Sequence, residues 1–101
     1  MKLNIQSPDI TLKQEIIYFL KQKLAMLSRR LNEIIGVDVS FRKEKSSTGE
    51  NKICEIRLII PGNDLFAYSQ CKTFGKAITK TSEALERQIE KRKTKLLKDV
   101  K

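Results

Sequence analysis

The chain has 101 residues with a formal net charge of +9, and 40% of the residues are hydrophobic. This length supports one domain with a single modest core. We place the domain over residues 1–101 and expect the last few residues to be flexible. The positive charge attracts polyanions through counterion release. Because no stretch approaches the roughly 20 apolar residues of a membrane span and the N-terminus lacks a signal-peptide core, we expect a cytoplasmic protein without a membrane partner.

A strand and a helix are predicted at the N-terminus. Residues 2–6 alternate between polar and apolar side chains, as in a short half-buried strand. Thr11 is the predicted N-cap of the helix, because Gln14 lies three positions later, as in a capping box. The helix, expected from Leu12 to about Leu31, turns five apolar side chains toward the core: Ile16, Leu20, Leu24, Leu27 and Leu31.

Three further strands are predicted in the middle of the chain. The apolar side chains of residues 37–41 alternate with polar ones, and this strand runs into the basic segment 42–45. Residues 53–60 and 65–71 alternate in the same way. The turn sequence at 61–64, Pro-Gly-Asn-Asp, predicts that these two strands form an antiparallel hairpin.

The hairpin has a predicted register with a four-residue turn. The predicted pairs are Ile60–Leu65, Leu58–Ala67, Ile56–Ser69 and Cys54–Cys71. A facing cysteine pair stays reduced in the cytoplasm, so we interpret Cys54 and Cys71 as small core residues rather than a redox pair. On the other face Arg57 would lie beside Tyr68 and Ile59 beside Phe66. The two aromatic side chains either stack on bases or are partly covered by their neighbours, and the sequence leaves both readings open.

The last thirty residues carry the strongest functional signal. Residues 72–101 hold ten Lys or Arg and four Asp or Glu. At about 100° per residue, a helix here turns one stripe toward the core, namely Phe74, Ile78, Thr81, Leu85, Ile89 and Leu96. Four cations share one flank and are called the basic ridge: Lys80, Arg87, Lys91 and Lys98. Lys95 lies near the edge of the stripe, and the far side carries Glu83, Glu86 and Glu90. A ridge largely free of acid predicts an extended anionic partner.

The order strand, helix, three strands, helix predicts an α+β fold. In this β-α-β-β-β-α arrangement, two amphipathic helices pack on one face of a four-stranded sheet. On the first helix, Lys23 and Arg30 share one flank of the apolar stripe, so both helices present cations beside their buried faces.

The chain resembles a known family in three segments and in their order. The segments are Met1-Lys2-Leu3-Asn4-Ile5, Phe41-Arg42-Lys43-Glu44-Lys45 and Leu85-x-Arg87-Gln88-Ile89-x-Lys91-x-Lys93-x-Lys95-Leu96. They look like the ribosome hibernation-promoting factors, which include ribosome-associated inhibitor A and are also known as sigma-54 modulation proteins. The resemblance covers essentially the whole chain, which looks like a short form because it stops soon after the last helix.

The resemblance implies a protein that binds the small ribosomal subunit and its ribosomal RNA. Family members lie in the channel of mRNA and tRNA, with which they compete, and they inhibit translation under stress or in stationary phase. The cations that match basic positions of the family pattern are Lys23, Arg42, Lys45, Arg87, Lys91, Lys93 and Lys95. Arg92 falls where a family member has His or another polar residue. Together with the positions from the helical faces, the predicted RNA-binding side chains are Lys23, Arg30, Arg42, Lys45, Lys80, Arg87, Lys91, Arg92, Lys93, Lys95 and Lys98.

One segment departs from the family pattern at the start of the second helix. The family's Asp-(Leu/Met)-Tyr-x-Ala-Ile-Asp is here Thr73-Phe74-Gly75-Lys76-Ala77-Ile78-Thr79. Both acids are absent, which makes this end more basic, and Gly75 takes the place of the tyrosine. That replacement could change a specific contact.

Other functions remain as alternatives. A generic double-stranded-RNA-binding module would use similar helices packed on a small sheet. An anti-sigma-like adaptor would bind a protein in a salt-insensitive manner. An enzyme is not expected, because the chain has no His, no Gly-rich phosphate loop and no metal-spaced ligands. We therefore expect no cofactor, no metal and no small-molecule substrate.

Overall fold

The computed structural model describes the backbone of residues 1–99 and the side chains of residues 1–95. Its elements are β1 (Lys2–Gln6), α1 (Gln14–Arg30), β2 (Gly36–Lys43), β3 (Lys52–Ile59), β4 (Leu65–Cys71) and α2 (Phe74–Asp99). The side chains of Leu96 and Lys98 and the end of the chain, predicted to be flexible, lie outside the described part.

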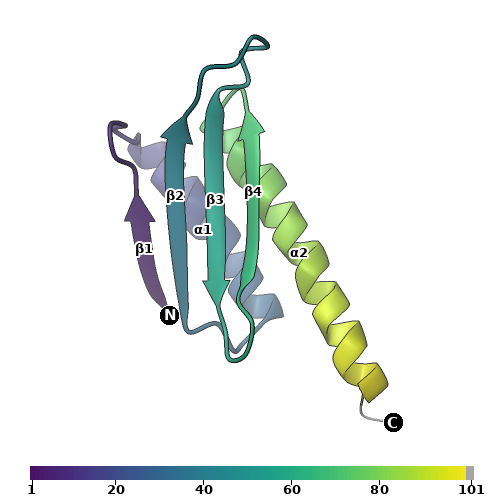
Figure 1. Cartoon of the computed structure of the whole chain (residues 1–101). Coiled ribbons are helices and arrows are strands. Elements are labelled where there is room, and N and C mark those ends of the chain that lie inside the picture. The colour runs from purple at the N-terminus through teal and green to yellow at the C-terminus, as the bar shows by residue number, and fades with distance from the viewer. Residues whose placement is uncertain (100–101) are drawn as a thin grey trace.

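The strands form one sheet in the order β1-β2-β3-β4. β1 runs parallel to β2, and the other neighbours are antiparallel. Both helices lie behind the sheet in Figure 1, and the front face carries none. The predicted β-α-β-β-β-α sandwich is therefore confirmed. Among residues 1–99, no helix is long and apolar enough to cross a membrane.

The core fills the space between the sheet and the two helices. The buried side chains of α1 are Leu20, Leu24 and Leu27, and those of α2 include Ile78, Leu85 and Ile89. From the sheet, Phe41 is fully buried and meets Phe74 edge to face, with the ring centroids 5.3 Å apart. Every described member of the two predicted apolar stripes is buried, except Ile16, which is half-buried. These contacts fix the direction in which the opposite face of each helix points.

The start of α1 differs from the prediction. The helix begins at Gln14, and the residue before it, Lys13, makes no side-chain cap hydrogen bond, so Thr11 is not the N-cap. Ile10 and Leu12 are half-buried and pack against the core. Their packing holds the chain extended up to Lys13 and overrides the local capping signal. The second helix is capped by a side chain, because Thr73 Oγ1 accepts a hydrogen bond from the Lys76 backbone N–H at 3.1 Å.

The register of the β3–β4 hairpin is shifted by two residues from the prediction. Leu58 opposes Leu65, and Cys54 opposes Ser69 instead of Cys71. A shift of two residues leaves every side chain on its predicted face, so the hydrophobic alternation cannot distinguish the two registers.

The turn of the hairpin explains the shift. Six residues, 59–64, separate the last pair of strand residues instead of four. The Ile60 backbone N–H donates a hydrogen bond to Asp64 Oδ1 at 3.4 Å, and Gly62 adopts a left-handed φ of 90°. The side chain of Asp64 thus closes a wider loop than the turn residues alone predict.

The front face of the sheet exposes aromatic side chains. Tyr68 is 64% exposed and Phe66 is 39% exposed. The register places Arg57 opposite Phe66, not beside Tyr68 as predicted, and its guanidinium lies 5.1 Å from the Phe66 ring centroid. Arg57 also forms an ion pair with Asp64 at 3.7 Å. Partial cover by a neighbour is therefore found for Phe66, while Tyr68 faces solvent.

Cys54 and Cys71 are free and buried. Burial raises the pKa of the Cys54 thiol from 9.0 to about 12, because the thiolate loses its hydration there. The folded state accordingly becomes less stable as the pH rises from 9 toward about 12, since only the unfolded chain then releases the proton of the Cys54 thiol.

We expect Cys54 to resist iodoacetamide at neutral pH in the folded protein and to react when the chain is unfolded in urea, because the thiolate is the nucleophile. Mass spectrometry of the labelled peptides measures both rates. Equal labelling of Cys54 with and without urea would contradict the buried, neutral thiol.

Candidate nucleic-acid interface

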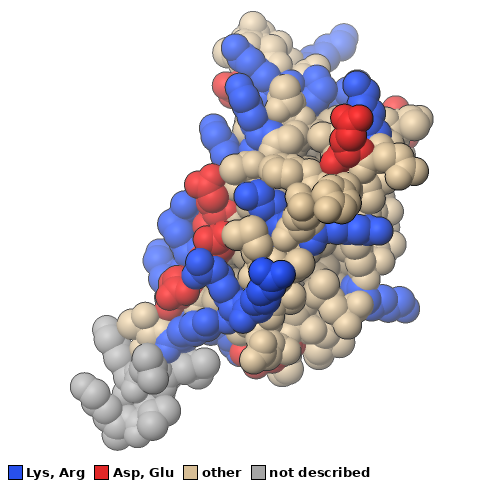
Figure 2. Space-filling view, turned by 180° about the vertical axis from the view of Figure 1, so that it is seen from behind, with Lys and Arg blue, Asp and Glu red and all other residues tan. Residues whose placement is uncertain are grey.

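The described members of the basic ridge, Lys80, Arg87 and Lys91, lie on the side of α2 that faces away from the sheet. Because the apolar stripe is buried, the opposite flank is directed to solvent, and Lys80, Arg87 and Lys91 are all exposed. Lys93 and Lys95 are exposed on the following turn. Figure 2 shows Lys and Arg side chains spread over this helical side of the molecule. Lys80, Arg87 and Lys91 thus form a row along one helix, with about 1.5 Å of rise per residue.

The acidic residues of α2 lie closer to the ridge than predicted. A hollow beside α1 is lined by Arg30, Glu83, Glu86, Arg87, Glu90 and Lys91. Arg30 Nη1 contacts Glu90 Oε1 at 3.3 Å. The three glutamates therefore border the ridge on the flank that faces α1, instead of lying on the far side. The physical reason is that Glu83 is one helical turn from both Lys80 and Arg87, and the basic end of α1 packs against this flank.

Three of the predicted RNA-binding cations have acidic partners. They are Arg30 with Glu90, Arg42 with Glu55, and Arg92 with Glu33. The pair of Arg92 and Glu33 has two hydrogen bonds, because Arg92 donates from Nε and from Nη2 to Glu33 Oε1 at 3.1 and 2.9 Å. Such partly exposed pairs contribute at most about 1 kcal/mol, so they do not prevent an arginine from exchanging its partner for a phosphate.

The other predicted cations occupy three separate places. Lys23 is half-buried on α1, where its Nζ lies 5.3 Å from the Phe19 ring centroid. Lys45 is exposed after the end of β2. Within residues 1–95, Lys80, Arg87, Lys91, Lys93 and Lys95 have no acidic oxygen at ion-pair distance among the described side chains. The three described ridge cations, Lys80, Arg87 and Lys91, thus keep their charge available on one flank of α2.

Comparison with protein families identifies the chain. The family described as "Sigma 54 modulation protein / S30EA ribosomal protein" matches residues 3–97. The chain belongs to this family. The resemblance to the sigma-54 modulation proteins is thereby confirmed at the level of the family.

Individual relatives agree with this assignment. A protein of Pseudomonas putida named ribosome hibernation promoting factor is 28% identical over 95 residues, which cover 94% of this chain and 89% of the relative. A ribosomal subunit interface protein from Coxiella burnetii has the same fold, with a TM-score of 0.82 at 19% identity over 93% of this chain and 99% of the other. The N-terminal domain of Protein Y from Thermus thermophilus superposes with a TM-score of 0.76 at 20% identity, covering 90% of this chain and 98% of that domain.

In this member of the S30EA family, Lys76 is a further exposed cation of α2 that the predicted RNA-binding set does not include. It is exposed one helical turn before Lys80 and extends the ridge toward the start of α2. The spacing of four residues between Lys76 and Lys80 could have predicted it from the sequence, because such residues share one face of a helix. Within the described residues, no group of three or more Cys, Asp and Glu side chains is arranged to hold a metal ion.

Proposed function

We propose that this chain is a ribosome hibernation factor. It binds the small ribosomal subunit in the channel of mRNA and tRNA, and so inhibits translation under stress or in stationary phase, in the cytoplasm and without catalysis. The proposal is supported by membership of the S30EA family and by a relative named ribosome hibernation promoting factor. The observation that carries it is the exposed row of Lys80, Arg87 and Lys91 along α2.

The mechanism is recognition of an RNA surface by shape and charge. The buried stripe fixes α2 against the sheet, so the ridge cations hold constant positions relative to those of α1 and of the segment after β2. Cations at fixed separations bind phosphates that match their spacing, and they read backbone shape more than base sequence. Occupancy of the channel then excludes mRNA and tRNA.

The test is co-sedimentation with purified bacterial small subunits, in competition with mRNA and initiator tRNA. We expect saturable one-to-one binding that prevents tRNA binding. Duplex RNA of similar length serves as the comparison, because a generic double-stranded-RNA-binding module would bind it equally well. Weak, unsaturable binding that free duplex RNA matches would refute the proposal.

Binding to the small subunit is expected to depend steeply on salt. If about five phosphates are neutralised, the affinity falls on the order of 10²- to 10³-fold between about 50 and 200 mM monovalent salt. The cause is that releasing counterions from the RNA into a more concentrated salt solution gains less free energy. Equilibrium sedimentation at constant Mg²⁺ concentration measures this slope. A slope near zero would indicate an apolar protein contact as the main source of affinity.

A further inference from the structure

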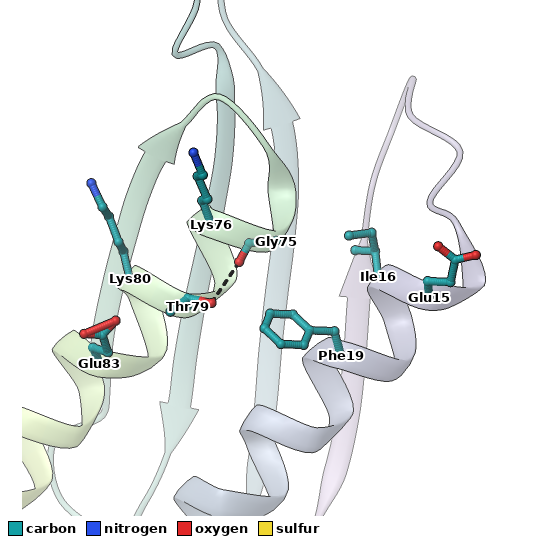
Figure 3. A pocket seen from close by; sticks show the side chains of 8 residues that line it. All are labelled: Glu15, Ile16, Phe19, Gly75, Lys76, Thr79, Lys80 and Glu83. Atoms are coloured by element: carbon teal, nitrogen blue, oxygen red, sulfur yellow. Dashed lines mark hydrogen bonds between the residues drawn. The ribbon is translucent and has the colours of Figure 1, made fainter.

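A groove opens between the N-terminal parts of α1 and α2 (Figure 3). Its volume is about 550 Å³, within the range of small-ligand sites. The lining residues are Glu15, Ile16 and Phe19 of α1 and Gly75, Lys76, Thr79, Lys80 and Glu83 of α2. None of these except Lys80 belongs to the predicted RNA-binding set.

The surface of the groove is apolar and includes an aromatic ring. The Phe19 side chain extends from α1 toward α2, and Ile16 lies one turn away on the same side (Figure 3). The Thr79 hydroxyl donates to the Gly75 carbonyl at 3.0 Å, so its hydrogen is used within the helix. A flat aromatic ring in an apolar groove offers a stacking surface for another flat ring.

Gly75 leaves its side of the groove unfilled. A Cβ atom added there would meet no heavy atom within 4 Å, so the missing side chain leaves free space. Its backbone does not adopt a left-handed conformation, so the helix does not require a glycine here. Glycine is less favourable than alanine inside a helix, by about 1 kcal/mol. A tyrosine, as in the family pattern, would project from this position.

Charged groups stand around the groove and connect it to the basic ridge. Lys76 and Lys80 are exposed on the α2 side, and Lys80 is itself a ridge residue. Glu15 and Glu83 contribute carboxylates, which accept hydrogen bonds from amino groups such as those of adenine or cytosine. An apolar stacking surface beside two cations and a hydrogen-bond acceptor matches the parts of a nucleotide.

We propose that the groove binds one unstacked base of ribosomal RNA, with the adjoining phosphates on Lys76 and Lys80. This inference rests on the proposed function and names a specific RNA contact for it. The continuity with the ridge favours RNA over an apolar protein segment, since a lysine pair beside an apolar groove has no partner in such a segment. Removing a base–aromatic contact of this kind weakens binding about 5- to 150-fold.

Three variants separate filling of the groove from other effects. Gly75→Leu fills it with an aliphatic side chain, while Gly75→Ala makes the same change of helix propensity and leaves it open. Phe19→Leu removes the ring but keeps an apolar side chain of similar size. We expect Gly75→Ala to bind small subunits within about twofold of the native chain, and Gly75→Leu and Phe19→Leu to bind at least fivefold more weakly. Equal affinity of all four proteins would overturn the proposal.

Chemical probing of the bases identifies the occupant. With the native chain and with Gly75→Ala bound, we expect one nucleotide of the small-subunit RNA to change its reactivity, and we expect no change with Gly75→Leu. A loss of affinity with no nucleotide that depends on residue 75 would mean that a protein side chain fills the groove, and the proposal would be wrong.

A titration without the ribosome separates this inference from the proposed function. A short single-stranded oligoadenylate, followed by amide NMR shifts, should perturb the region of Ile16, Phe19 and Thr79 in the native chain and not in Gly75→Leu. This result would support the groove even if the native chain failed to bind small subunits, which would refute the function alone. Absence of such shifts in the native chain would refute base binding by the groove.

Discussion

Reversing two ridge charges together, with Arg87→Glu and Lys91→Glu, is expected to abolish binding to small ribosomal subunits while the chain remains folded. Both side chains are exposed and have no acidic partner at ion-pair distance within the described residues, so neither supports the core. Each lost charged hydrogen bond to a phosphate contributes about 1.5–3 kcal/mol, and the new carboxylates repel the RNA. The expected loss is therefore at least 100-fold in affinity.

Co-sedimentation measures this loss, and circular dichroism checks the fold. The control is the pair Lys2→Glu and Lys13→Glu, which changes the net charge equally at exposed positions outside the predicted RNA-binding set. We expect the control to reduce the affinity only slightly, through the lower net positive charge of the whole protein. Unchanged co-sedimentation of the ridge variant, or an equal loss in the control, would remove the ridge from the binding site.

Phe41→Ala is expected to lower the free energy of unfolding by about 3–5 kcal/mol, because it leaves a cavity at the centre of the core. Phe41 is fully buried on β2, and its contact with Phe74 joins the sheet to the first turn of α2. Its loss therefore affects the element that carries the ridge.

Urea unfolding measures this change, with Phe41→Leu as the conservative comparison. The leucine variant keeps most of the apolar volume and should lose less than half as much stability. A change below about 1 kcal/mol for Phe41→Ala would show that the contact between β2 and α2 is not a main support of the fold.

The helical faces were predictable because burial follows a local period. The stripes of α1 and α2 require only the spacing of apolar residues, and Leu20, Ile78 and Leu85 are buried as expected. The exposure of Lys80, Arg87 and Lys91 on one flank of α2 was predictable for the same reason, since that flank lies opposite the stripe.

The remaining features depend on contacts between distant segments. The hairpin register was wrong by two residues because Asp64 closes a wider loop, and a period of two hides such a shift. The N-cap at Thr11 was wrong because Leu12 packs against the core. The groove requires the relative placement of Phe19 and Gly75, which lie on different helices, and no local pattern contains that information.

The absence of a helix on the front of the sheet makes the two sides of the molecule electrically unequal. On the sheet side, Arg57 is paired with Asp64 and Arg42 with Glu55, whereas Lys80, Arg87 and Lys91 on the other side form no ion pair within the described residues. A polyanion therefore exerts a torque on the approaching protein and turns its helical side inward before contact. Fewer encounters then occur in the wrong orientation, so the association rate constant should exceed that of an unsteered encounter. A fluorophore near the exposed Tyr68 would report binding from the side of the protein that remains in solvent.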